Sequence, residues 1–60
     1  MQYKVLHETF RDFLERDVQQ HLEKGWELPP GSSLVVAVDN SGKGHFYREV
    51  VKYDNPFERR

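Results

Sequence analysis

The residues that could do chemistry in this 60-residue chain do not form the pattern of an enzyme. There is no cysteine to serve as a nucleophile, and no arrangement of serine, histidine and aspartate indicates a hydrolase triad. Asp39 stands alone beside a predicted turn, and paired carboxylates that share acid–base work need a cleft that separates their pKa values. A chain this short has little room for such a cleft. We therefore predict a non-enzymatic protein with no catalytic residue.

The three histidines are the only imidazoles that could bind a metal, and they are far apart in the sequence. Zinc sites usually contain pairs of ligands a few residues apart. His7 and His45 could meet on neighbouring strands, whereas His21 lies in a predicted helix. Histidines at the surface or at a sheet edge explain this pattern without a metal. We predict no metal site and no cofactor.

Residues 41–44, Ser-Gly-Lys-Gly, contain residue types that are common in phosphate-binding loops. The spacing Gly-x-x-x-x-Gly-Lys-Ser/Thr is absent and no helix follows, so a hairpin turn is the simpler interpretation. In the alternative interpretation, Lys43 and the neighbouring backbone donors bind an anion.

The segment 26–33 contains the clearest ligand-binding pattern. Pro29 and Pro30 stiffen the loop, which lowers the entropy cost of ordering it around a ligand. An aromatic ring can stack on a base for about 1–3 kcal/mol, and Arg48 offers a planar fork suited to phosphate oxygens. In the simpler alternative, Trp26 fills the end of the core where the helix meets the sheet. The predicted ligand-binding residues are Trp26, Pro30, Gly31, Ser32, Ser33, Lys43, Tyr47 and Arg48.

Hydrophobic periodicity divides the chain into four elements and a tail. Alternating residues predict a strand at 2–8, and apolar residues on one helical face predict a helix at 10–24. Apolar runs on either side of a Gly-rich turn predict strands at 33–39 and 45–53. Residues 54–60 form a polar tail. The whole chain, 1–60, is short enough to be a single domain.

Both ends of the predicted helix carry capping signals. Thr9 and Asp12 have the spacing of a capping box at its start. Gly25 supplies the left-handed residue that commonly ends a helix. Five residues on one helical face are expected to point into the core, namely Phe10, Phe13, Leu14, Val18 and Leu22.

The order strand, helix, strand, strand predicts an α+β fold, with one helix on one face of a three-stranded antiparallel sheet. We prefer the strand order 1-3-2, in which every neighbouring pair is antiparallel. The order 3-2-1 needs a parallel pair and a right-handed crossover. The second and third strands are apolar on both faces, and one helix covers only one of them. This excess of apolar surface predicts a homodimer or a multiple of one, through the open face or a strand edge.

Composition and charge restrict the partners. Nine basic and ten acidic residues give a net charge of −1, without the basic excess typical of proteins that bind nucleic acids. No apolar run approaches the roughly 20 residues that a membrane span needs. The first residues lack the apolar stretch of a signal peptide, and the absence of cysteine argues against a disulfide-stabilised secreted class. We predict a cytoplasmic protein that contacts no membrane and has no general affinity for nucleic acid.

The motifs Tyr-Lys-Val at 3–5 and Gly-Trp-Glu-Leu at 25–28 flank an amphipathic helix, and Tyr47 and Tyr53 lie in the closing strand. In these features the chain resembles a family of small β-α-β-β domains of unknown function from bacteria and phages, over roughly residues 2–53. The stiff Pro-Pro-Gly loop departs from the family pattern. The resemblance implies the fold and a bacterial or phage origin, and it transfers no catalytic residue.

Two functions agree with these features. In the first, a homo-oligomer binds a small anionic, nucleotide-like ligand where the loop 29–33 meets the third strand of a neighbouring subunit. The resemblance to phage proteins implies a role for such a homo-oligomer. We expect it to sequester a nucleotide signal of host defence, as a molecular sponge. In the alternative, the protein is an inhibitor or adaptor that covers the surface of a protein partner, such as a host defence protein, with its apolar sheet face.

Overall fold

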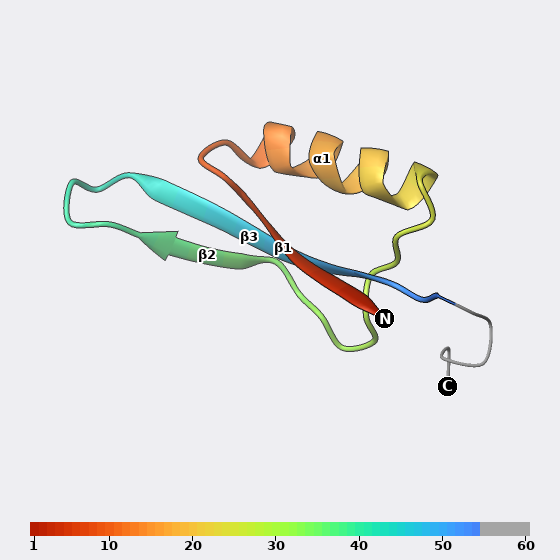
Figure 1. Cartoon of the computed structure of the whole chain (residues 1–60). Helices are drawn as coiled ribbons and strands as arrows, with labels where there is room; N and C mark the ends of the chain where they lie inside the picture. Colours follow the sequence, from red (N-terminus) through yellow and green to blue (C-terminus); the bar gives the residue numbers. More distant parts are fainter. Residues whose placement is uncertain (55–60) are drawn as a thin grey trace.

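One helix and three antiparallel strands make up the computed structural model, which describes residues 1–54 (Figure 1). The helix lies on one face of the sheet, and the strands are in the order β1-β3-β2. The α+β fold and the preferred strand order are therefore confirmed. Most of the predicted polar tail, residues 55–60, lies outside the described residues. The elements in chain order are β1 (Gln2–Glu8), α1 (Arg11–Glu23), β2 (Val35–Val38) and β3 (Gly44–Lys52).

The central strand β3 has different neighbours along its length. On one side, β1 pairs with it from Gln2 to Glu8, which is the whole of β1. On the other side, β2 pairs only with the first half of β3 and ends at the pair Val35–Tyr47. β2 is shorter than the predicted strand at 33–39, because Leu34 turns away from the ladder and packs against the core. The second half of β3 therefore has a largely open edge.

The helix begins one residue later than predicted, so the predicted capping box is wrong. Phe10 is the N-cap residue, with extended backbone angles of φ −127° and ψ 132°, and no side chain caps the helix. The first helical bond runs from the Leu14 N–H to the Phe10 carbonyl at 3.1 Å. Thr9 lies one residue too far from the first turn to reach its free N–H groups. The helix therefore starts without the side-chain oxygen that usually satisfies them.

The predicted glycine stop at the end of α1 is confirmed. Gly25 has φ +94°, in the left-handed region that a residue with a side chain rarely adopts. Its N–H donates to the Leu22 carbonyl at 3.2 Å, and the Trp26 N–H donates to the His21 carbonyl at 2.9 Å. These two bonds form a Schellman motif, which turns the chain back toward the sheet.

The core is small and lies between the middle of α1 and the adjoining strands. Leu6, Leu14 and Val50 are buried against one another, and Val51 is buried on the opposite face of the sheet. Around this centre pack the partly buried side chains of Val18, Trp26, Leu28, Leu34 and Phe46. The one helix covers one face of the sheet, and few side chains in the described residues become fully buried.

The predicted inward face of the helix is only partly correct. Leu14 is 2% exposed and Val18 is partly buried, as predicted, but Phe10 is 62% exposed and Phe13 is 46% exposed. Leu22 is also exposed, at 37%. The rings of Phe10 and Phe13 pack edge to face against each other, with centroids 5.4 Å apart, instead of entering the core. Phe10, Phe13 and Leu22 therefore stay at the surface of the protein.

A hairpin extends beyond the part of the sheet that the helix covers (Figure 1). We call the segment 35–47 the hairpin arm. It contains β2, the turn and the first half of β3. Its valines are exposed on both faces, with Val35 and Val36 at 54% and Val38 at 68%. The described residues measure 44 × 19 × 15 Å along their principal axes. The molecule is thus elongated, and the arm carries three exposed valines.

Candidate functional site

A gap in one edge of the sheet creates the candidate site. The chain returns to β3 at Glu27, which forms an isolated antiparallel bridge with Val51 through two backbone hydrogen bonds of 2.7 and 2.8 Å. β2 leaves β3 at Tyr47. Between these two contacts, residues 48–50 have no strand partner on this edge, and the segment 28–34 loops away from the sheet.

Ladder geometry determines which backbone groups face this gap. Val51 both donates to and accepts from Glu27, so its N–H and C=O point toward this edge. Backbone groups alternate in direction along a strand, and those of Glu49, two residues earlier, therefore point the same way. No backbone bond from Glu49 crosses this edge within residues 1–54. The gap thus offers one donor and one acceptor to a bound molecule.

The loop above the gap is tightly turned. The Ser32 N–H donates to the Pro29 carbonyl at 3.1 Å, and Gly31 has φ +78°. No atom lies within 4 Å of the position that a Cβ on Gly31 would take. A side chain at this position would therefore be opposed by the backbone conformation and not by crowding, and the Gly31 backbone remains open to approach.

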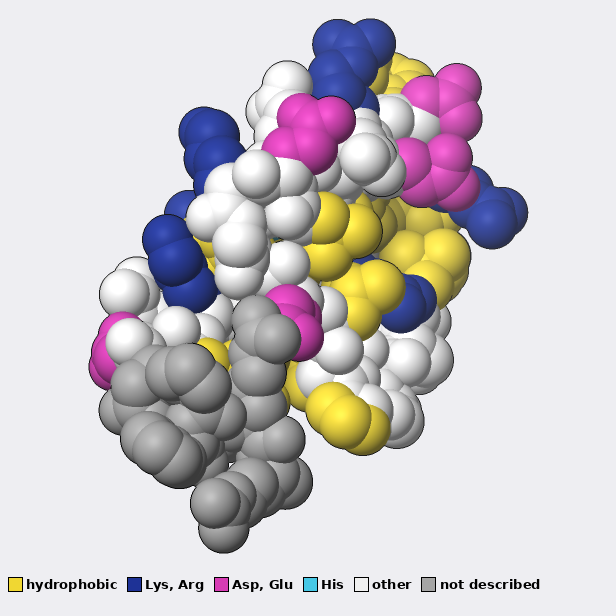
Figure 2. Space-filling view, turned by 90° about the vertical axis from the view of Figure 1, so that its right-hand side faces the viewer, with side chains coloured by type: hydrophobic (Ala, Val, Ile, Leu, Met, Phe, Trp, Pro, Cys, Tyr) yellow, Lys and Arg dark blue, Asp and Glu magenta, His cyan; other side chains and the backbone are white. Residues whose placement is uncertain are grey.

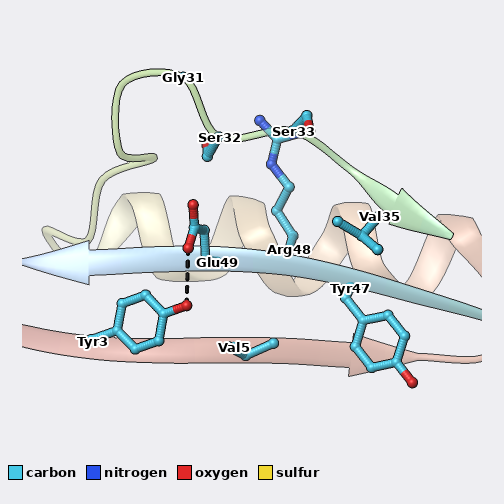
Figure 3. Close-up of a pocket in the computed structure, with 9 residues that line it drawn as sticks. All are labelled: Tyr3, Val5, Gly31, Ser32, Ser33, Val35, Tyr47, Arg48 and Glu49. Carbon is cyan, nitrogen blue, oxygen red and sulfur yellow. Dashed lines mark hydrogen bonds between the residues drawn. The ribbon is translucent and has the colours of Figure 1, made fainter.

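A groove of about 270 Å³ lies between this loop and the face of the sheet opposite α1 (Figure 3). Residues from all three strands and the loop line it. They are Tyr3, Val5, Gly31, Ser32, Ser33, Val35, Tyr47, Arg48 and Glu49. A second groove, of about 220 Å³, lies beside α1 and is lined by Arg11, Leu14, Glu15, Val18, Gln19, Leu28, Leu34 and Arg48. Arg48 borders both grooves, because its side chain passes through the gap.

The two charged residues of the first groove have different surroundings. The Glu49 carboxylate accepts a hydrogen bond from the Tyr3 hydroxyl at 2.9 Å. This bond, with smaller contributions from desolvation and from the negative charge of Glu49, raises the pKa of Tyr3 above its ordinary value. The Arg48 side chain extends toward the loop and ends beside Ser33 (Figure 3). Within residues 1–54, it makes no hydrogen bond or ion pair.

The structure brings together part of the predicted ligand-binding set. Gly31, Ser32, Ser33, Tyr47 and Arg48 line one groove, and Pro30 lies in the loop above it without lining it. The loop approaches β3 of its own chain, so this part of the predicted site needs no neighbouring subunit.

Trp26 and Lys43 lie elsewhere. The Trp26 ring packs against the core, edge to face with His21 at 5.7 Å, and the Lys4 ammonium lies 5.4 Å from its centroid. This position is the simpler alternative that the sequence offered. Lys43 lies in the hairpin turn, where its backbone N–H donates to the Asp39 carboxylate at 3.0 Å. Asp39 also accepts from the N–H and hydroxyl of Ser41, so the donors of this turn already bind an internal anion.

Sequence reasoning missed Tyr3, Val5, Val35 and Glu49 in the groove. The strand order 1-3-2 places β1 beside β3, and the register pairs Val5 with Glu49 and Tyr3 with Val51. Residues paired in this way point to the same face of the sheet. The preferred strand order, combined with the alternation of the strands, would have indicated these residues if the register had been known.

Asp39, which has no neighbouring carboxylate in the sequence, has a histidine partner in the structure. Its carboxylate accepts a hydrogen bond from Nε2 of His45 at 2.8 Å, and Nδ1 of His45 lies 2.9 Å from Nε2 of His7. The expectation that His7 and His45 could meet on neighbouring strands is confirmed. The His45 bond, followed by the bonds from Ser41 and Lys43, holds the pKa of Asp39 well below its usual range.

Three negative findings concern relatives, metal ions and membranes. No family model, curated protein or solved structure matches the chain. Among residues 1–54, no three or more histidine, cysteine, aspartate or glutamate side chains are grouped to hold a metal ion. No helix in the described part of the chain is long and apolar enough to cross a membrane. The function of the protein is therefore inferred from the geometry of the groove.

Proposed function

We propose that this protein is a non-enzymatic binding domain that holds the anionic group of a small ligand in the groove between the 29–33 loop and β3. The observation that carries the proposal is the Arg48 side chain. It is partly buried, it lines the groove, and it has no acidic partner within the described residues. The other interpretation of Arg48, as half of a surface ion pair, has no support in this part of the chain.

The groups around Arg48 suit an oxyanion such as a phosphate. The guanidinium presents several N–H donors in a plane, which matches the oxygens of phosphate or carboxylate. Ser32 and Ser33 add hydroxyl donors, and Gly31 leaves the loop backbone accessible. Glu49 lies at the same groove, but its carboxylate is bonded to Tyr3. The anion is therefore expected at the end of the groove where the Arg48 guanidinium lies beside Ser33 (Figure 3).

The size and lining of the groove restrict the ligand. Its volume of about 270 Å³ is slightly below the range of roughly 300–1,000 Å³ that is usual for small-molecule sites. Tyr47 and Val35 provide an aromatic and an apolar wall. A mononucleotide fits this description better than a larger molecule does, with its phosphate at Arg48 and its base against Tyr47. A role in sequestering a nucleotide signal of host defence in the cytoplasm depends on the resemblance alone and stays a prediction.

Titration calorimetry with inorganic phosphate and a panel of linear and cyclic nucleotides tests this proposal. We expect saturable binding that weakens at least tenfold in Arg48→Ala and less in Arg48→Lys, which keeps the charge but loses the planar fork. Arg16→Ala is the matched control, because Arg16 lies over the Phe13 ring, outside the groove. Absence of heat from every compound, or equal affinity in Arg48→Ala, would refute the proposal.

A protein-binding inhibitor or adaptor remains the second candidate, and the exposed apolar side chains favour it. On the open face of the sheet, Tyr3 is 59% exposed, Val5 50% and Val35 54%. Figure 2 shows hydrophobic side chains reaching the surface between charged ones on another side of the molecule. Residues of this kind are common in protein interfaces. Failure of all nucleotides to bind, with the protein monomeric and folded, would favour this function.

A further inference from the structure

Three polar side chains form a hydrogen-bonded row outside the groove. The row runs from the Asp39 carboxylate in the hairpin turn to His45 at the start of β3 and then to His7 in β1. The Asp39–His45 distance is 2.8 Å, and the two imidazole nitrogens are 2.9 Å apart. We call this row the histidine clasp, because it connects the hairpin arm to the neighbouring strand β1.

The partners of Asp39 determine where the protons lie. Oδ1 of Asp39 accepts from Ser41 and from the Lys43 N–H, so the group is an ionised carboxylate that accepts at Oδ2 as well. His45 must therefore carry a hydrogen on Nε2. A neutral imidazole has only one N–H, so Nδ1 of His45 is then an acceptor for the N–H of His7 Nε2. Each ring of the clasp holds one proton, and every hydrogen bond is made.

This arrangement can accept one further proton without opening. If His45 becomes an imidazolium, its Nδ1–H turns from acceptor to donor, and His7 can accept at Nε2 by moving its own proton to Nδ1. If both rings become imidazolium, each facing nitrogen carries a hydrogen and no acceptor remains between them. Two positive charges then lie at hydrogen-bonding distance, and the contact has to open.

Charged and aromatic groups around the clasp come from the hairpin turn, β3, β1 and α1. Asp39 in the turn stabilises a charge on His45, and the ring of Tyr47 in β3 lies against His7 with centroids 4.8 Å apart. In β1, Glu8 follows His7. The pKa of Glu8 is raised because Asp17 of α1 bonds its carboxyl group, with burial and the charge of Asp17 adding to the effect, while His7 acts in the opposite direction. Among residues 1–54, Asp39 is the acidic residue that bonds an imidazole of the row.

We propose that the histidine clasp is a pH-sensitive latch, which holds the hairpin arm against β1 near neutral pH and releases it when both imidazoles are protonated. Histidine is the side chain whose charge ordinarily changes closest to neutral pH. β1 pairs with the arm at Tyr47 and Phe46, and the clasp lies where this pairing ends, so it acts at the point where the arm leaves the rest of the sheet. The proposal concerns the arm itself and does not depend on a ligand in the groove.

Two NMR measurements on the whole chain test the latch. The first is the tautomer of each ring at pH 8, for which we expect the hydrogen on Nε2 of both His45 and His7. The second is the protection of the amides of residues 44–47 from hydrogen exchange, corrected for the intrinsic pH dependence. We expect this protection to fall at least tenfold between pH 7.5 and pH 5, relative to that of Leu14 in α1.

Substitution of single histidines shows whether the loss of amide protection in acid comes from the clasp or from the protonation of other groups. In His7→Gln, the residue at position 7 no longer titrates, and the pH-dependent loss of protection should disappear. His21→Gln is the matched control, because His21 bonds Lys4 and the Asp17 carbonyl away from the clasp, and it should keep the pH response. A pH response in His7→Gln equal to that of the wild type would overturn the proposal. So would a hydrogen on Nδ1 of His45 at pH 8, which is measured on the wild type alone.

Discussion

The Tyr3 hydroxyl donates to the Glu49 carboxylate at 2.9 Å and connects β1 to β3 at the edge of the groove. The bond gives Glu49 a partner, while Arg48, the next residue in the chain, has none within residues 1–54. Two opposite charges thus adjoin one groove without pairing with each other. This separation makes an anion site possible at Arg48.

The bond has a consequence that can be titrated. Because Glu49 is the main cause of the raised pKa of Tyr3, Glu49→Gln should bring that pKa back toward the ordinary value for tyrosine. We expect no comparable change at Tyr53, which serves as the internal reference. The resonance of the tyrosine Cζ carbon, followed from pH 8 to pH 12, measures both groups. An unchanged pKa of Tyr3 in the variant would show that the bond is not formed in solution.

The centre of the core predicts a clear order among helix substitutions. Leu14→Ala should lower the free energy of unfolding by about 2–5 kcal/mol, since Leu14 is 2% exposed and the cavity it leaves cannot be filled easily. Phe13→Ala removes a larger side chain, but one that is 46% exposed, and should cost clearly less. Urea denaturation followed by the fluorescence of Trp26 gives both values. A greater loss in Phe13→Ala would mean that the helix is rotated relative to the structure.

The lowered pKa of Asp39 predicts a loss of stability in acid. A carboxyl group with a pKa below its unfolded value of 3.8 stabilises the fold at higher pH. This contribution is lost as the pH falls from about 3.8 toward the lower folded value. Asp39→Asn lacks the contribution, so its thermal midpoint should lie below that of the wild type at pH 7. The difference should shrink as the pH falls below 3.8, and a constant difference would contradict the assignment.

The exposed valines of the hairpin arm predict self-association. Val38 is 68% exposed, so Val38→Lys costs a monomer little stability, yet it would place charges in an interface. We expect the wild type to sediment as a dimer or a multiple of one, and Val38→Lys to sediment as a folded monomer. Ser41→Lys, with its lysine in the hairpin turn, is the control that should keep the assembly. A monomeric wild type at micromolar concentration would remove this prediction while leaving the groove intact.

Local patterns in the sequence determined the elements of this protein. Alternating residues located β1, helical periodicity located α1, and Gly25 ended the helix with its positive φ. These features depend on neighbours within a few residues, so a single sequence contains them. The antiparallel order 1-3-2 also followed, because a split arrangement pairs every strand with an antiparallel neighbour.

Tertiary structure alone decided which residues of those elements are buried, line the groove or form the histidine clasp. Phe10 and Phe13 share a helical face with Leu14, but only Leu14 is buried, whereas the two rings pack against each other at the surface. Arg48 reaches the loop through a gap in the edge of β3. The gap lies between Tyr47, where the pairing with β2 ends, and Val51, which pairs with Glu27. Asp39, His45 and His7 are up to 38 residues apart, and strand register brings them into one row. Periodicity tells which face a residue occupies, and it does not tell what lies opposite that face.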